Sequence, residues 1–428
     1  MAARSLSGEA IQEHKGRWRI AWLLGAGVLV NYFDRVNLSV SHNALIAAFG
    51  ISDVVYGALS SAYNWTYALC QLPVGVVLDK LGVRRVGRFG ALLWSVASFA
   101  AAATPNLSGL FGARLLLGVG EAPTFPANAK AIGAWFPEQE RSFATSLFDA
   151  AAKFASAIGV PLLGIVLIRA GWRWSFAFTG VVSFVYLLIF WKVYREPEEE
   201  PAVPGLRERI SPAETQSPRN GETPASPLGR LLFNRKVVGV ALGFGAYSYV
   251  FYLLLYWLPA YLSSALHVDL LHSFLYTSVP WLIAAASDLL VGGWLVDYLV
   301  QRGWNASHVR RVVLIGGMLF GLGILGAVHA ENAAHAVMWI SVSLCGLAAS
   351  APVAWSLPSL VAGPSDVGKV GGIINFSGQL SGIAAAMVTG TLVTKLHSYA
   401  WAFAIAGAYL AAGIAGYAFL LGKIEPEA

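Results

Sequence analysis

The residues in this sequence that are best suited to do chemistry are charged side chains inside long hydrophobic segments. Asp34 and Arg35 stand late in the first such segment, and Arg114 and Glu121 stand in the fourth. A charge at the centre of a membrane helix costs about 2.5–3.5 kcal/mol on insertion scales, so its presence indicates a function. We therefore expect these four residues to bind and move an anionic solute.

The positions of Asp34 and Arg35 predict different tasks for them. Neighbouring residues on a helix point about 100° apart, so these two side chains cannot face the same spot. We assign Arg35 to a central cavity, and Asp34 to a contact with a neighbouring helix or to a proton site. The alternative is that both lie at the membrane surface.

Arg114 and Glu121 are seven residues apart, which is two helical turns, so they project from one face of a helix. A guanidinium group can hold a carboxylate through two charge-assisted hydrogen bonds. A buried glutamate is suited to carry a proton, because its affinity for that proton depends on how close a cation lies. The alternative is a structural ion pair that fixes helix packing.

Asp149 and Lys153 are four residues apart, the spacing of an ion pair on one helix. Either the pair neutralises itself, or Lys153 reaches the substrate while Asp149 compensates its charge. Asp288 and Lys130 are weaker candidates, for a packing contact and for an interfacial charge respectively.

Further polar and aromatic residues could complete a pocket. Each of them more often forms a helix-to-helix hydrogen bond than a ligand contact, because buried amides and hydroxyls need partners. They are Tyr63, Asn64, Tyr67, Gln71, Trp355, Ser356, Asn375, Ser377 and Gln379.

The elements that must position these residues are membrane-spanning helices. Of the 428 residues, 57% are hydrophobic and only 12% are charged, against roughly 25% charged in an average soluble domain. A hydrocarbon core about 30 Å thick needs about 20 apolar residues per helix. The sequence therefore predicts an all-α integral membrane protein with twelve transmembrane helices in two six-helix bundles. The predicted spans are 18–40, 54–78, 87–104, 108–131, 141–168, 173–194, 237–262, 274–300, 311–329, 334–361, 370–395 and 399–422.

The polar segment 195–235, rich in Pro, Ser and charge, predicts a linker between the two bundles, 18–194 and 236–422. Most Lys and Arg residues of the short loops lie on the side that holds this linker and the terminal segments 1–17 and 423–428. By the positive-inside rule this side is cytoplasmic, so we expect both termini in the cytoplasm.

An internal repeat supports the division into halves. The pattern Gly-x-x-x-Asp, followed by arginines, ends with Asp79 after the second span and with Asp297 after the eighth. An acid here can meet a helix N-terminus or an arginine, and the glycine allows close packing. We expect Asp79 and Asp297 to latch the cytoplasmic side; an ordinary charged turn is the alternative.

Other functions are poorly supported. No nucleophile, base and orienting partner occur together, so we expect no enzyme, and no P-loop pattern indicates an ATP-driven pump. The run from Gly321 to Gly326 matches G-x-G-x-x-G, but it lies inside a span with no strand before it. Histidine and cysteine spacings do not fit a metal site, and the basic residues form no nucleic-acid-binding face. We therefore expect no metal, no cofactor and no nucleic acid.

Three runs of residues resemble the major facilitator superfamily. Within it they are similar to the anion:cation symporter family, which includes bacterial galactonate, glucarate and hexuronate transporters and, more distantly, sialin and vesicular glutamate transporters. The resemblance covers essentially the whole chain. Its most specific parts are Asn31 to Leu38, Gly120 to Asn128 followed by Trp135 to Pro137, and Trp355 to Pro358 with Gly371 to Phe376.

This resemblance implies a monomer in the bacterial inner membrane, whose two bundles rock so that a central site opens to each side in turn. It also implies site roles. Arg35 and Tyr67 contact the carboxylate or hydroxyls of a sugar acid, and Arg114 gates or couples with Glu121. Trp355, Ser356 and Asn375 contribute from the second half, and Asp34 and Glu121 carry protons.

Lys153 departs from the galactonate-like members, which tend to have a neutral amide there, and span seven lacks the arginine of the vesicular glutamate branch. A cation at this position favours a second acidic group, hence a dicarboxylate, or an aromatic carboxylate beside Tyr63, Tyr67 and Trp355.

The function expected is proton-coupled uptake of a sugar acid or related organic anion across the lipid bilayer. One alternative is export or exchange of aromatic or dicarboxylic acids by the same fold. The other is a receptor built on a transport fold, which binds a ligand without net flux.

Overall fold

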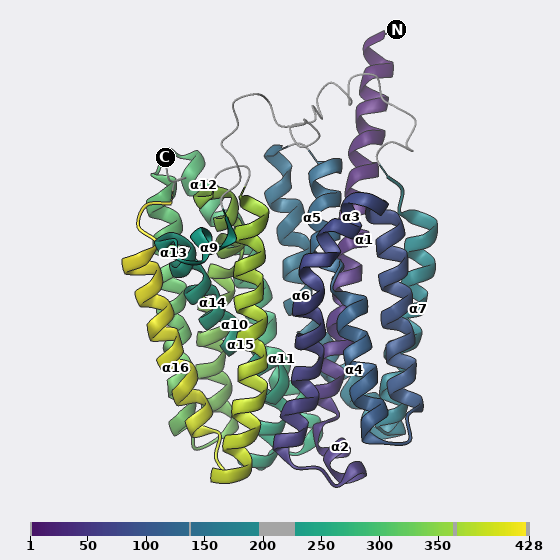
Figure 1. Ribbon diagram of the computed structural model, residues 1–428, viewed down its shortest axis with the longest axis vertical. Helices are drawn as coiled ribbons and strands as arrows, with labels where there is room; N and C mark the ends of the chain where they lie inside the picture. Colours follow the sequence, from purple (N-terminus) through teal and green to yellow (C-terminus); the bar gives the residue numbers. More distant parts are fainter. Residues whose placement is uncertain (1, 137, 197–226, 363–365, 425–428) are drawn as a thin grey trace.

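The computed structural model describes residues 2–136, 138–196, 227–362 and 366–424, and its regular elements in these ranges are all helices (Figure 1). No water reaches hydrocarbon to satisfy backbone N–H and C=O groups, and a helix satisfies them internally. The predicted all-α membrane fold is confirmed.

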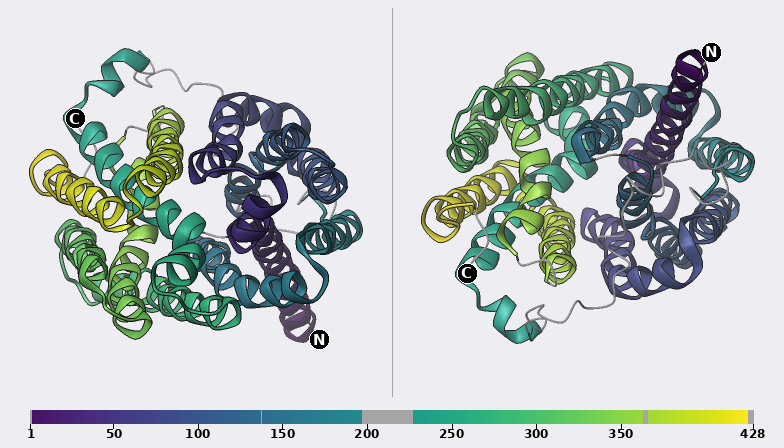
Figure 2. Two further views of the ribbon diagram at one scale, coloured as in Figure 1. Left: turned by 90° about the horizontal axis from the view of Figure 1, so that it is seen from below. Right: turned by 90° about the horizontal axis from the view of Figure 1, so that it is seen from above.

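The first half of the molecule, coloured purple to teal in Figures 1 and 2, comprises the helices up to residue 193. Its first helix begins at Ala2 rather than at residue 18, because the polar residues before the span continue the helix. The elements are α1 (Ala2–Val40), α2 (His42–Phe49), α3 (Asp53–Ala103), α4 (Leu107–Glu121), α5 (Thr124–Trp135), α6 (Glu138–Ala170) and α7 (Trp172–Val193).

The second half, coloured green to yellow, lies beside the first (Figure 2). Of the predicted linker 195–235, residues 197–226 lie outside the described part of the chain. The elements are α9 (Leu228–Leu232), α10 (Arg235–Ala260), η2 (Tyr261–Ala265), α11 (Leu270–Ser287), η3 (Asp288–Leu295), α12 (Val296–Gln301), α13 (Ala306–Gly321), η4 (Leu322–His329), α14 (Ala333–Val361), α15 (Val367–Leu396), α16 (Ala400–Ala415) and η5 (Gly416–Leu420).

Among the described residues, nine helices are long and apolar enough to cross a membrane, and α2 with the start of α3 forms a bent tenth. The two other predicted spans are α1 and the pair α4 and α5. These segments carry Asp34, Arg35, Arg114 and Glu121. The span formed by α4 and α5 is also interrupted between Glu121 and Thr124. The helices α4 and α5, of 15 and 12 residues, are each too short to cross a membrane alone.

The chain enters and leaves the membrane at well-defined helix ends. Gly82, with φ 77°, divides α3 into two spans, and this left-handed φ favours glycine. Asn106, Asn305 and Asn332 cap the helices that follow them by accepting a hydrogen bond from a backbone N–H. The start of α1 and the end of η5 lie on one side, called here the terminal side, and α2 lies on the opposite, far side (Figure 1).

The two halves repeat one construction. Arg19 of α1 donates a hydrogen bond to the carbonyl of Val193 at the end of α7, at 3.4 Å. Arg235 of α10 donates in the same way to the carbonyl of Phe419 in η5. In each half a glycine of the first helix also makes room for a tyrosine of the last: Gly27 for Tyr186, and Gly243 for Tyr417.

The halves are in close contact on the far side. A Cβ atom at Gly57 would lie 2.5 Å from the carbonyl oxygen of Ala386, so only glycine allows this approach. The Tyr256 carbonyl accepts hydrogen bonds from Ser39, at 3.0 Å, and from Tyr56, at 3.4 Å. These contacts close the far side in this state.

The latch predicted at Asp79 and Asp297 is not visible as a pair of matching contacts. The Asp79 side chain lies outside the described part of the chain, and Asp297 is exposed in α12. Nearby, the backbone N–H of Arg84 donates to the Glu196 carboxylate at 2.8 Å, which joins the turn within α3 to the residues that follow α7. The gating role of the two aspartates stays a prediction.

Candidate functional site

A cavity of about 50 Å³ lies between the halves, deep in the molecule. Five of the six residues predicted to bind substrate line it: Arg35, Tyr67, Lys153, Trp355 and Asn375. Ser356 is not among its lining residues, and its hydroxyl donates to the Val353 carbonyl of its own helix at 2.7 Å. The remaining wall is largely aromatic: Tyr32, Phe125, Phe244, Tyr247, Phe251 and Tyr252.

The helix α1 contributes one cation, Arg35, to the wall of this cavity, and this residue is only 1% exposed. Its guanidinium carbon lies 4.5 Å from the ring centre of Tyr32, 4.8 Å from that of Tyr63 and 5.4 Å from that of Tyr67. Ring faces attract a cation and partly replace its lost hydration. The Nη2 atom of Arg35 is buried and has no hydrogen-bond partner in the described chain.

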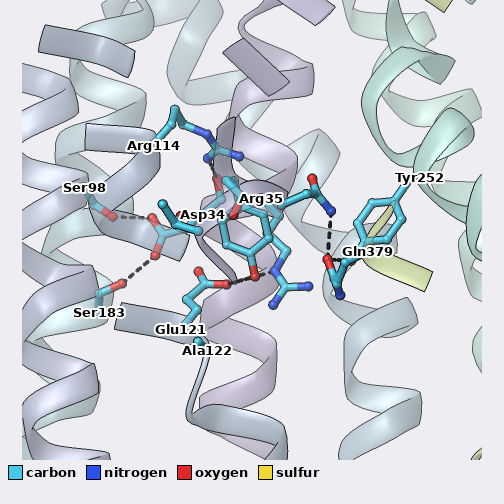
Figure 3. A network of polar contacts seen from close by, with 12 residues as sticks. Asp34, Arg35, Ser98, Arg114, Glu121, Ala122, Ser183, Tyr252 and Gln379 are labelled. Carbon is cyan, nitrogen blue, oxygen red and sulfur yellow. Dashed lines mark hydrogen bonds and ion pairs between the residues drawn. The ribbon is translucent and has the colours of Figure 1, made fainter. Parts of the chain in front are cut away.

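Glu121, at the end of α4, pairs with Arg35 and not with Arg114. The Arg35 Nε atom donates to Glu121 Oε2 at 2.9 Å, and the Tyr63 hydroxyl donates to the same oxygen at 2.9 Å. Glu121 Oε1 is buried without a partner among the described residues. Figure 3 shows the contact between Arg35 and Glu121 as a dashed line. One carboxylate oxygen is therefore well held, while the other is available for a proton.

Asp34 points away from Arg35, as the 100° rotation between neighbours predicts. Its carboxylate accepts hydrogen bonds from Ser98 at 2.6 Å and from Ser183 at 2.9 Å (Figure 3). Both hydroxyls belong to the first half, so Asp34 lies inside that bundle and not in the cavity wall.

Arg114 is buried beside these residues. It donates to the backbone carbonyl of Asp34 at 3.3 Å, and its guanidinium carbon lies 5.5 Å from the ring centre of Tyr63. Its Nε and Nη2 atoms are buried without partners in the described chain. Arg114 thus ties α4 to the part of α1 that carries Asp34 and Arg35.

Lys153 of α6 lies between two carboxylates. Its Nζ atom is 2.7 Å from Asp149 on the same helix and 2.5 Å from Asp288 of η3, in the other half. The sequence placed Asp149 correctly beside Lys153 but assigned Asp288 only a packing contact. The rule for intramembrane charges that selected Glu121 also selected Asp288, but only as a weaker candidate.

Amide side chains connect the halves beside the cavity, between α3 and α15. Asn64 donates to Gln379 at 2.9 Å, and Tyr252 donates to the same Gln379 oxygen at 3.2 Å (Figure 3). Asn375 donates to Gln71 at 3.0 Å. Sequence reasoning proposed these amides for the pocket and missed Tyr252, because a tyrosine in an apolar segment does not stand out as a charge does.

This arrangement can bind an anion and handle protons. Arg35 lines the cavity and has a donor atom without a partner in the described chain, Glu121 pairs with the same guanidinium group, and rings provide flat apolar surfaces. In the described chain, no group of three or more His, Cys, Asp or Glu side chains could hold a metal ion.

Comparisons with known proteins show which family the chain is similar to. The sequence pattern described as Major Facilitator Superfamily matches residues 24–386. An uncharacterized transporter, YybO, of Bacillus subtilis (strain 168) is 38% identical over 419 residues, which cover 96% of this chain and 95% of the relative. The D-galactonate transporter of Escherichia coli O6:H1 is 32% identical over 413 residues, which cover 93% of this chain and 94% of the relative.

Solved structures agree on the fold. The crystal structure of a D-xylose-proton symporter superposes with a TM-score of 0.70 at 15% identity and covers 96% of this chain and 98% of that one. The family match over most of the chain, the two full-length relatives and this fold lead to one conclusion: the chain is a transporter, not an enzyme, and belongs to the major facilitator superfamily.

Proposed function

We propose that this protein takes up a sugar acid or a similar organic anion together with protons, by alternating access in the bacterial inner membrane. The observation that carries the proposal is the buried Arg35, which faces the cavity with one guanidinium nitrogen free and another bonded to Glu121. The D-galactonate transporter among the relatives supports a sugar acid as the substrate class.

The carboxylate of such a substrate fits the cation Arg35. A guanidinium group binds a carboxylate through two parallel N–H donors, and in a dry cavity this bond is strong. Tyr67, Asn375 and Gln379 offer hydroxyl and amide groups for the hydroxyls of a sugar chain. Trp355 and Phe125, stacked with ring centres 6.3 Å apart, offer a flat surface to its carbon skeleton.

Proton coupling follows from competition for Arg35. If the substrate carboxylate takes the guanidinium group, Glu121 loses its cation while it stays buried, and a buried unpaired carboxylate is costly. Binding a proton removes that cost. Asp34, held by two hydroxyls and next to Arg35 in the chain, is proposed as a second proton carrier, and Arg114 as the residue that transmits its state to α4.

The cavity volume supports alternating access. A volume of about 50 Å³ holds a few water molecules. A six-carbon sugar acid is larger, so the halves must part before it enters. The far side is closed in this state, and the substrate path on the terminal side opens by rocking of one half against the other.

Direction and substrate class define the alternatives. The aromatic wall suits an aromatic carboxylate, so an exporter or exchanger of aromatic or dicarboxylic acids on the same site is the second candidate. Flux follows the imposed gradients, and measurement of flux also separates a transporter from a receptor that only binds.

Uptake by purified protein in proteoliposomes tests the proposal. We expect labelled galactonate, glucuronate or glucarate to accumulate when the outside is acidic, and accumulation to disappear when the proton gradient is collapsed. Empty liposomes are the control. Accumulation that ignores the gradient would contradict proton coupling, and absence of uptake for every organic acid would contradict the substrate class.

A further inference from the structure

The buried charges within the described spans do not cancel. Leaving aside His42 and Asp366, which lie at helix starts, seven charged side chains are buried: the cations Arg35, Arg114 and Lys153, and the acids Asp34, Glu121, Asp149 and Asp288. The four residues around Glu121 comprise two cations and two acids, which balance. The excess negative charge therefore lies in the cluster of Asp149, Lys153 and Asp288.

Asp288 is the member of this cluster whose carboxylate lacks a hydrogen-bond partner at Oδ1 in the described chain. Its side chain is fully buried, at 0% exposure. Lys153 approaches the other oxygen, Oδ2, at 2.5 Å. A buried carboxylate oxygen without a donor is costly, and a proton on that oxygen removes both the cost and the excess charge.

No other charged side chain of the described chain offers this oxygen a partner. From α10 the cluster faces Tyr247, and from α1 it faces Tyr32 and Arg35 across the cavity, where Arg35 is already paired with Glu121. The helices α11 and α14, which pack against η3, carry no Asp, Glu, Lys or Arg in their described residues, and their histidines lie near the far side. The helix α12, which also packs against η3, carries Asp297, an acid that is exposed.

We propose that Asp288 binds a transported proton of its own, in addition to the protons proposed at Glu121 and Asp34. A metal ion does not fit, because the Lys153 ammonium group already occupies the space between the two carboxylates. The inference rests on the proposed proton-coupled transport and adds a second coupling site, in the other half of the molecule.

Alternating access supplies the reason for proton exchange at Asp288. Lys153 and Asp149 share the helix α6 and stay paired as that helix moves, whereas Asp288 belongs to the second half. When the halves part at this level, Asp288 loses Lys153 and meets water, so its carboxylate is hydrated and gives up the proton. When the halves close, the excess charge is buried again and Asp288 takes up a proton from water.

The first test counts protons in transport. Asp288→Asn places an amide of the same shape where the proton would bind, so one coupled proton is lost. In proteoliposomes with labelled galactonate, a tenfold inward proton gradient and no membrane potential, loss of one proton lowers the maximal accumulation about tenfold. Equal accumulation and an equal reversal potential in wild type and Asp288→Asn would overturn the inference.

The second test needs no transport. Infrared spectra of the purified full-length protein at neutral pH should contain the C=O absorption of a buried protonated carboxylic acid, and Asp288→Asn should lose that component. Asp149→Asn leaves a neutral pair of Lys153 and Asp288, so it should lose the component as well, and it serves if Asp288→Asn folds poorly. Asp269→Asn, at an exposed acid that caps α11, is the matched control that keeps it.

The outcomes separate the two proposals. A wild-type protein that transports no organic acid but shows the Asp288-dependent absorption would contradict the proposed function and retain the site. A wild-type protein that transports galactonate, with spectrum and proton count unchanged in both Asp288→Asn and Asp149→Asn, would retain the function and overturn the site.

Discussion

At the scale of single residues, the central feature is that two carboxylates, that of Glu121 and that of the proposed substrate, compete for Arg35. Glu121 accepts a hydrogen bond from its Nε atom, its Nη2 atom is buried without a hydrogen-bond partner in the described chain, and the residue lines the cavity. The three tyrosine rings around the guanidinium group keep it in place whichever carboxylate it binds, because they attract the cation without neutralising it. In the proposed transport cycle, substrate binding and release of Glu121 are therefore one event.

The first prediction concerns this pair. Arg35→Ala should weaken substrate binding by about 30-fold or more, because loss of one partner of a buried charge pair costs about 2–5 kcal/mol. Glu121→Gln should keep binding and exchange but lose accumulation driven by protons, since an amide cannot carry the proton. Binding assays and gradient-driven uptake on both variants check the expectation, and normal accumulation by Glu121→Gln would refute the proton role.

A smaller change tests how Glu121 is held. Tyr63→Phe removes the hydroxyl that donates to Glu121 Oε2 and leaves the ring beside Arg35. Loss of one hydrogen bond to a charged group costs about 1.5–3 kcal/mol. Glu121 should then bind protons more readily, and the pH dependence of uptake should shift to higher pH. An unchanged pH profile would show that Tyr63 serves packing alone.

Residue types and spacing alone located much of this site. The intramembrane rule selected Asp34, Arg35 and Glu121, and the structure buries all three. The pairing of Arg35 with Glu121 could not be predicted from the sequence, because the two residues are 86 positions apart and belong to different helices. The link from Lys153 to Asp288 was missed for the same reason, since it crosses between the halves.

At the scale of helices, glycine sets how closely the halves approach. Gly57 of α3 meets the backbone of α15, where a methyl group would collide with the Ala386 carbonyl. Sequence patterns predicted that glycines mark close packing, but they could not show which partner each one meets. They also could not place the break between α4 and α5, because the predicted span 108–131 runs across it without interruption.

The contact between Gly57 and Ala386 yields a prediction. Gly57→Ala places a Cβ atom 2.5 Å from the Ala386 oxygen, and overpacking of this kind costs about 1–3 kcal/mol. The far-side-closed state should lose population by about tenfold, measured as increased labelling of cysteines placed on the far side of the cavity. Gly112→Ala, in α4 with no atom within 4 Å of the new Cβ, should change nothing.

At the scale of the whole molecule, the two halves are copies of one plan. In each, an arginine of the first spanning helix donates a hydrogen bond to a backbone carbonyl near the end of the last spanning helix. The internal Gly-x-x-x-Asp repeat predicted two related halves, but not these contacts, which only the folded chain brings together. The rocking proposed for transport needs two stiff bodies and a contact surface that separates.

The orientation of the molecule gives a further prediction. The distribution of Lys and Arg predicts that the terminal side is cytoplasmic. In a background with Cys70 and Cys345 replaced by serine, Arg169→Cys should react with a membrane-impermeant thiol reagent added to intact cells, because Arg169 is exposed on the far side. Arg302→Cys, exposed on the terminal side, should react only after the cells are opened. The reverse pattern would invert the topology.

The stacked rings of Phe125 and Trp355 have a consequence for observing the protein at work. One ring belongs to α5 in the first half and the other to α14 in the second, and they lie nearly parallel, at 9°. When the halves separate between these two rings, the indole of Trp355 exchanges an apolar neighbour for water, and its fluorescence emission shifts to the red. The difference between spectra of the wild type and Trp355→Phe, recorded as substrate is mixed in, would then time the opening with no dye attached.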